Sequence, residues 1–179
     1  MNASCTRKKF LLTGGIAAVA SLLPRSQGLA QTSPAAASQS PGAAPSIPDR
    51  GPQLDPARVK QFVIAGHANL PVVKEMLAAE PALINGSWDW GSGDFETALG
   101  GASHMGRPDI AEFLLEHNAR MDVFAAAMLG RLEIVKAAVA AFPGIVRVPG
   151  PHKIPLIAHA EKGGAPAVAV LDFLRPLVG

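Results

Sequence analysis

Residues 97–119 read TALGGASHMGRPDIAEFLLEHNA, and this stretch decides how the rest of the chain is interpreted. Its second part places Ile110, Phe113 and Leu114 at spacings i, i+3 and i+4, so these side chains share one face of a helix. Its first part is rich in Ala and Gly, and Gly106 ends it before the turn. The stretch therefore predicts two short helices joined by a turn, of which the second has a branched apolar stripe.

The same plan recurs along the chain, as expected for an internal repeat. Residues 62–74 read FVIAGHANLPVVK and residues 124–136 read FAAAMLGRLEIVK, with Phe, Leu, Val and Lys matching at a constant offset. In the second of these copies we expect an apolar stripe of Ile134, Val135, Ala138 and Val139. A further copy begins near Ile154. The predicted repeats cover residues 57–85, 95–122, 123–148 and 152–176.

Composition and repetition together indicate the fold class. Aromatic residues make up only 5% of the chain, and Tyr is absent, which argues against a β-sandwich and favours helices. A single helix pair cannot bury its apolar stripe alone, so successive pairs must stack. The sequence therefore predicts an all-α solenoid of about four helix-turn-helix repeats over residues 57–178.

These repeats resemble those of the ankyrin repeat family, over essentially the whole region predicted to fold. The residues that carry the resemblance include Thr97, Leu99, Ala102, Gly106, Leu114, Leu115, Asn118, Ala119, Pro155, Leu156 and Gly163. The resemblance implies a non-catalytic module that binds another protein through the tips of its fingers and the concave face of its first helices.

An enlarged finger is predicted between the first two copies, where residues 86–95 read GSWDWGSGDF. Aromatic side chains concentrate binding energy at protein interfaces. The predicted partner-binding residues are therefore Trp88, Asp89, Trp90 and Asp94 on the finger, with His104 and Met105 on the first-helix face. An alternative stays open, in which Trp88 and Trp90 pack over the core.

Residues 1–30 have the order of a cleaved export signal: a basic start, an uncharged stretch FLLTGGIAAVASLLP at 10–24, and small residues before residue 31. The stretch is shorter than the about 20 residues that a membrane span needs. Residues 6–12, TRKKFLL, resemble a twin-arginine signal, although Lys8 stands where that signal has its second Arg. The sequence predicts a periplasmic or secreted protein, with the export route open and no membrane span after signal removal.

Residues 31–56 contain six prolines among Ala, Ser and Gly, which predicts a disordered linker. Four of the 16 Lys and Arg residues precede this linker, where no Asp or Glu occurs, so 12 basic face 14 acidic residues in the rest. This balance argues against a nucleic-acid partner. The single cysteine, Cys5, leaves with the signal. We expect a monomer with an unidentified protein partner.

Five histidines, at positions 67, 104, 117, 152 and 159, raise the question of a metal site. We interpret His67 and His117 as residues at helix ends, where a cation suits the helix dipole. His159 aligns with a buried position and is predicted to be a hydrogen-bonded core residue. For His104 the sequence nominates no carboxylate partner. The sequence therefore predicts no metal, no cofactor and no catalytic residue.

Two other functions stay open. One is a small metal- or ligand-dependent enzyme, for instance a metal-dependent hydrolase, that uses the histidines with Asp89 and Asp94. The spacing of these two carboxylates lacks the alternation of a calcium loop, so turn residues are the better interpretation. The other is an accessory factor for another exported protein.

Overall fold

The computed structural model of the chain describes residues 50–179. In this range the chain is mostly helical, which confirms the predicted class apart from one short hairpin. The α-helices are α1 (Pro56–Gly66), α2 (Leu70–Ala79), α3 (Ala98–Met105), α4 (Pro108–Glu116), α5 (Val123–Met128), α6 (Leu132–Ala141), α7 (Leu156–Gly163) and α8 (Val168–Val178). The 3₁₀ segments are η1 (Pro81–Asn85), η2 (Pro143–Arg147), η3 (Pro151–Lys153) and η4 (Ala165–Ala167), and the strands are β1 (Ser87–Asp89) and β2 (Phe95–Thr97).

The predicted signal, residues 1–30, and most of the predicted linker, residues 31–56, lie outside the described residues. In the described range, none of the helices combines the length and the apolar character needed to cross a membrane.

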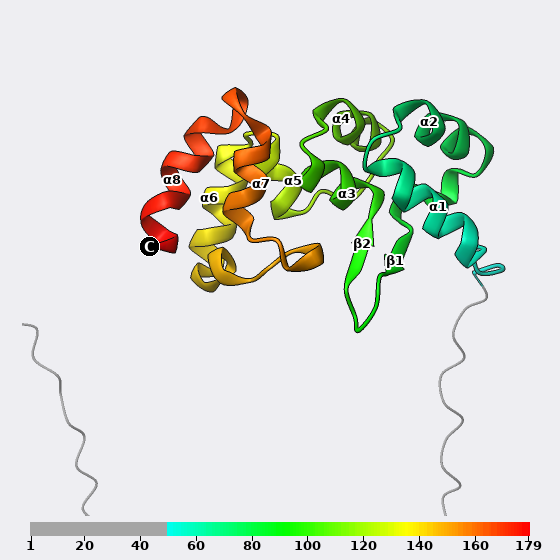
Figure 1. The fold of residues 1–179 in the computed structure, drawn as a ribbon, viewed down its shortest axis with the longest axis horizontal. Helices are drawn as coiled ribbons and strands as arrows, with labels where there is room; N and C mark the ends of the chain where they lie inside the picture. The colour runs from blue at the N-terminus through cyan, green and yellow to red at the C-terminus, as the bar shows by residue number, and fades with distance from the viewer. Residues whose placement is uncertain (1–49) are drawn as a thin grey trace, which may run out of the picture. The chain divides into compact units, whose positions relative to one another are not determined.

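The α-helices form four consecutive pairs within the described range (Figure 1). In each pair the second helix packs on the first: α2 on α1, α4 on α3, α6 on α5 and α8 on α7. The first helices also contact one another in order, from α1 to α3, α5 and α7. The first helices therefore form one continuous row that the second helices cover.

Local sequence explains where the helices of the second and third pairs begin. The Thr97 hydroxyl accepts a hydrogen bond from the Gly100 N–H at 3.1 Å, and the Asp122 carboxylate accepts one from the Ala125 N–H at 2.7 Å. Each is an N-cap that satisfies a backbone donor left free at the helix start. Helix α3 ends at Met105, and the cap residue that follows it, Gly106, has a φ of 67°, which suits a residue without a Cβ.

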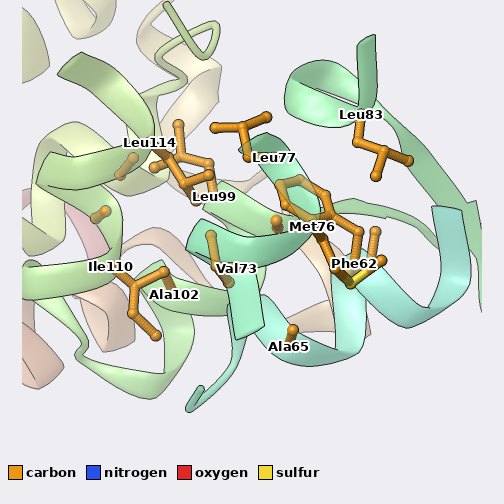
Figure 2. Close-up of a cluster of buried hydrophobic side chains, with 14 of the residues drawn as sticks. Phe62, Ala65, Val73, Met76, Leu77, Leu83, Leu99, Ala102, Ile110 and Leu114 are labelled. Atoms are coloured by element: carbon orange, nitrogen blue, oxygen red, sulfur yellow. The ribbon is translucent and has the colours of Figure 1, made fainter. Parts of the chain in front are cut away.

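The apolar side chains form two core clusters. The first gathers buried residues of α1 to α4 and extends to Ala125 and Met128 of α5. Figure 2 shows part of it, with Phe62, Val73, Met76, Leu77, Leu99, Ile110 and Leu114 among the labelled side chains. The second gathers Ala126, Ala127 and Val135 with buried residues of α7 and α8. Helix α5 thus contributes to both clusters.

The predicted apolar stripes are correct in part. Ile110 and Leu114 of α4 are fully buried, and so is Val135 of α6. Ile134, however, is 45% exposed, so its predicted place in the stripe of the third pair is wrong. Val135 alone of the two neighbours points into the second core cluster, because adjacent positions of a helix face different directions.

The enlarged finger is an antiparallel hairpin of β1 and β2, with Trp88 opposite Glu96. At its tip, the Asp89 carboxylate accepts hydrogen bonds from the N–H groups of Gly91 and Gly93 at 2.8 and 3.2 Å. Asp89 is therefore a turn residue, as the sequence predicted. On β2 the exposed residue is Phe95 and the buried one is Glu96, which reverses the usual preference of these side chains.

Candidate functional site

Four side chains that are distant in the sequence meet beside this hairpin. His67 follows the last residue of α1, Glu96 lies in β2, His104 lies in the last turn of α3, and His152 lies in η3. One nitrogen or oxygen from each of the four lies within 4.8 Å of the others. We call these four residues the His/Glu cluster.

Glu96 is the centre of the His/Glu cluster, and its side chain is fully buried. His104 Nε2 lies 2.9 Å from one carboxylate oxygen, Oε1. His67 Nε2 and His152 Nε2 lie 3.3 and 3.4 Å from the other oxygen, Oε2. The indole N–H of Trp90 donates a hydrogen bond to Oε2 at 2.8 Å. A buried carboxylate is thus surrounded by three imidazoles and one indole.

The opposite edges of two imidazole rings are held by fixed acceptors. His67 Nδ1 lies 2.9 Å from the Val63 carbonyl oxygen, and His152 Nδ1 lies 3.1 Å from Asp94 Oδ2. A carbonyl oxygen and an ionised carboxylate only accept hydrogen bonds, so the proton of each neutral ring resides on Nδ1. The Nε2 atoms of His67 and His152 are then unprotonated, and the lone pair of each is directed at a carboxylate oxygen.

Lone pairs directed at a carboxylate repel it unless a positive charge lies between them. Protons can supply this charge, and contact with Glu96 does raise the pKa of His67. Burial of the Glu96 carboxyl acts to raise its own pKa, but contacts with His104, His67 and Trp90 outweigh burial and hold the pKa far below its ordinary value. Glu96 is therefore a buried anion that needs compensation by cations.

A metal ion would supply the same charge at a single point. A tetrahedral ion with bonds of 2.0–2.1 Å separates its ligands by about 3.3–3.4 Å. The distances from Glu96 Oε2 to His67 and His152 are 3.3 and 3.4 Å. Moreover, Glu96 Oε1 and His104 Nε2 are buried atoms without an aligned hydrogen bond to any described residue. Both are available as ligands.

Two glycines of α3 make room for the His/Glu cluster. A Cβ at position 101 would lie 2.7 Å from His67 Nδ1, and a Cβ at position 100 would lie 3.2 Å from Glu96 Cγ. The two glycines lie in the first-helix row, where α1 and α3 pack together. The Ala- and Gly-rich sequence of α3 therefore permits the approach of His67 as well as the packing of helices.

His152 reaches the His/Glu cluster from a strained segment. Its φ is 56°, and that of the next residue, Lys153, is 59°. Such angles are unfavourable for residues that have a Cβ, and they persist only where surrounding contacts enforce them. Asp94 provides such contacts, because its Oδ1 accepts the His152 backbone N–H at 2.8 Å while its Oδ2 faces Nδ1 of the same residue.

The structure brings three of the predicted binding residues together at this cluster: Trp90, Asp94 and His104. Trp88 is half-buried against the first core cluster, with the Lys60 ammonium 5.1 Å from the centre of its ring. Asp89 stays at the hairpin tip, and Met105 is 49% exposed. The predicted set is therefore divided between the His/Glu cluster, the hairpin tip and the surface.

The other histidines lie outside the His/Glu cluster. His117 Nδ1 lies 2.8 Å from the Phe113 carbonyl oxygen at the end of α4, which agrees with its predicted place at a helix end. His159 is fully buried in α7, and its Nδ1 lies 3.1 Å from the Pro155 carbonyl oxygen. The prediction of a hydrogen-bonded core histidine at 159 is confirmed.

Sequence reasoning missed Glu96, the carboxylate partner that it did not find for His104. The available signal was weak: an acidic residue at the end of a Gly-rich finger, directly before the N-cap Thr97. A glutamate in a hairpin is expected to be exposed, and only the tertiary packing beside α1 and α3 buries this one. No short motif connects positions 67, 96, 104 and 152.

Comparison with known proteins gives no relative for this chain. No family model matches it, and neither do any of the curated proteins or solved structures compared.

Proposed function

We propose that this protein binds one divalent transition-metal ion through His67, Glu96, His104 and His152, and that Zn²⁺ fits the site best. The observation that carries the proposal is the convergence of Nε2 of His67 and Nε2 of His152 on one oxygen of a buried carboxylate. Each ring presents this nitrogen because its Nδ1 is held by a separate acceptor. Such outer partners are typical of metal-ligating histidines.

The ligand types narrow the class of ion. Imidazoles suit Zn²⁺, Cu²⁺, Ni²⁺ and iron, whereas Ca²⁺ and Mg²⁺ prefer oxygen ligands. The His/Glu cluster offers three imidazoles and one carboxylate. Four protein ligands complete a tetrahedral shell, which is typical of structural zinc, while catalytic zinc keeps one position for water or substrate. The proposal therefore favours a structural ion over a metal-dependent hydrolase.

Calorimetric titration of the chelator-treated full chain tests this proposal. We expect one Zn²⁺ per chain and no measurable binding of Mg²⁺ or Ca²⁺. His67→Gln should weaken zinc binding at least tenfold, because it removes a ligand. His117→Gln is the matched control, because each of these histidines directly follows a helix and places Nδ1 against the carbonyl oxygen four residues earlier. Absence of zinc binding, or an equal loss in both variants, would contradict the proposal.

Protein binding is a second candidate function, and two exposed apolar side chains favour it. Phe95 is 61% exposed and Met105 is 49% exposed, and they directly adjoin Glu96 and His104 in the sequence. In an ankyrin-like array, as the repeats suggest, these positions belong to the finger and the first-helix face. We propose that a partner in the periplasm or outside the cell is bound there, in keeping with the export signal expected from residues 1–30.

Comparative affinity capture tests the second candidate. The tagged chain and a Phe95→Ser/Met105→Ser variant are exposed to the same periplasmic extract, after both are shown to unfold at the same temperature. A partner held by the unchanged chain and lost by the variant is expected. Equal capture by both proteins would remove these two side chains from the interface.

A further inference from the structure

We infer that the bound ion cross-links the two core clusters of the helical array, with His152 as the ligand that joins the second to the first. This inference rests on the proposed metal binding and adds its consequence for the fold. The ligands are divided unequally: His67, Glu96 and His104 belong to segments packed on the first core cluster, from α1 to α3. His152 lies in η3, between η2 and α7, which belong to the second.

The segment that contains His152 extends toward the hairpin. Figure 1 shows the chain before α7 reaching from the α7 side toward β2. The carboxylate of Asp94 holds this segment at the hairpin, because it faces both the backbone N–H and Nδ1 of His152. His152 is thus the η3 residue that contacts the hairpin: besides Asp94, it faces Glu96 Oε2 at 3.4 Å, and its ring centre lies 5.7 Å from that of Trp90.

The surroundings of this link are open rather than tightly packed. A polar groove of about 460 Å³ separates the hairpin tip from η3, lined by Gly91, Ser92, Gly93, Asp94, Gly150 and Lys153. His152 itself keeps about a third of its side-chain surface exposed. Beside this groove the contact between η3 and the hairpin is made by the side chain of His152, and a bond from His152 to a metal ion would strengthen it.

Backbone strain makes η3 a segment that needs such a contact. Two consecutive residues, His152 and Lys153, have positive φ angles. Each of these conformations is unfavourable for a residue with a Cβ, so the segment relaxes when its partners release it. A metal ion bound to His152 and to Glu96 opposes this release, because opening η3 then breaks a coordination bond.

The expected effect follows from linkage. An ion that binds the closed arrangement more tightly than the opened one, which keeps three of the four ligands, suppresses opening at saturation by the ratio of its affinities for the two arrangements. If loss of the His152 ligand weakens zinc binding about tenfold, saturating Zn²⁺ makes opening movements that detach His152 about tenfold rarer. Because η3 leads directly into α7, amides of α7 and α8 are expected to share this protection.

Hydrogen–deuterium exchange of the full chain, with and without Zn²⁺, measures this effect. In the unchanged protein we expect zinc to slow exchange in α1 and α3 and also in residues 156–178. A His152→Gln variant keeps three ligands, so it should still bind zinc, but more weakly. The zinc concentration is therefore raised until this variant is saturated. There we expect zinc to protect α1 and α3 while its effect on residues 156–178 disappears. His117→Gln should behave as the unchanged protein.

The possible outcomes distinguish failure of the cross-link from failure of metal binding itself. If calorimetry detects no zinc binding by the unchanged protein, metal binding itself is refuted, and the cross-link with it. If zinc binds and protects α1 and α3 but leaves residues 156–178 unchanged, only the cross-link is refuted. Equal protection of residues 156–178 in the unchanged protein and in saturated His152→Gln would also overturn the cross-link alone.

Discussion

Gly101 of α3 lies against the imidazole of His67, so close that a Cβ at position 101 would stand 2.7 Å from Nδ1. That nitrogen is the one held by the Val63 carbonyl oxygen. The glycine therefore allows His67 to keep the orientation in which Nε2 faces Glu96. The relationship connects a small residue in the helix row with the geometry of the His/Glu cluster.

Gly101→Ala is expected to weaken zinc binding at least tenfold. The folding equilibrium constant of the metal-free protein should fall by much less than tenfold. The added methyl group displaces the ring of His67, while Ala favours the helix by up to about 1 kcal/mol over Gly. Calorimetry and urea unfolding in chelator measure the two effects. Gly144→Ala serves as the control, because a Cβ at 144 meets no atom within 4 Å. Unchanged zinc affinity in Gly101→Ala would contradict the expected displacement.

The two tryptophans of the hairpin are expected to differ in function. Trp90→Phe removes the indole donor to Glu96 Oε2, and loss of such an outer partner typically weakens metal binding 10- to 100-fold. Trp88→Phe should leave zinc affinity within about threefold, because Trp88 packs against the first core cluster. Zinc titration of both variants checks the difference. Equal affinities in the two variants would show that the Trp90 hydrogen bond does not support the site.

Asp94 is expected to act as a positioning residue for His152. Asp94→Asn removes the anionic acceptor that holds the His152 proton on Nδ1, so zinc affinity should fall roughly 10- to 100-fold. Nitrogen-15 NMR of the metal-free protein supplies a second measure, because His152 should shift toward a mixture of its two neutral tautomers at alkaline pH. A variant with unchanged affinity and an unchanged Nδ1–H tautomer would argue against this role.

The close approach of α5 and α7 can be tested at Gly163 of α7. A Cβ at this position would overlap the Met128 carbonyl oxygen at the end of α5. Overpacking of this kind typically costs about 1–3 kcal/mol, since backbone must shift to relieve it. Urea unfolding should therefore show Gly163→Ala less stable by this amount, with Gly144→Ala near the unchanged protein. An unchanged free energy of unfolding in Gly163→Ala would mean that α7 moves away from α5 with little loss of stability.

His159 is expected to destabilise the fold in acid. Its burial lowers its pKa below the ordinary value of 6.5. The unfolded chain therefore takes up a proton on this side chain at a higher pH than the folded chain does. Stability linked to neutral His159 is fully present above about pH 6.5 and is lost as pH falls through the folded-state pKa.

Thermal unfolding at pH 7.5 and pH 5 checks this expectation. The melting temperature of His159→Leu should fall less between pH 7.5 and pH 5 than that of the unchanged protein. The melting temperature of His117→Gln should fall as much as that of the unchanged protein. Proton NMR of the His159 ring should give a midpoint below 6.5 in the folded state. A midpoint at or above that value would refute the burial argument.

The sequence by itself determined the helix pairs, because the interactions that form them are local. The i, i+3, i+4 stripe of α4, the Gly after α3 and the acidic N-cap before α5 each act within a few residues. Ile134 shows the limit of such reasoning: two adjacent branched residues in α6 fit the pattern equally, but only Val135 is buried.

The tertiary structure alone decided the His/Glu cluster. Its four residues belong to the end of a helix, a hairpin strand, a second helix and a 3₁₀ segment, and no spacing in the sequence relates them. His67 and Glu96 meet because Gly101 allows α1 and α3 to pack closely, and His152 arrives through a backbone of unusual conformation that Asp94 holds in place. Contacts of this kind depend on how distant segments pack, which local patterns do not specify.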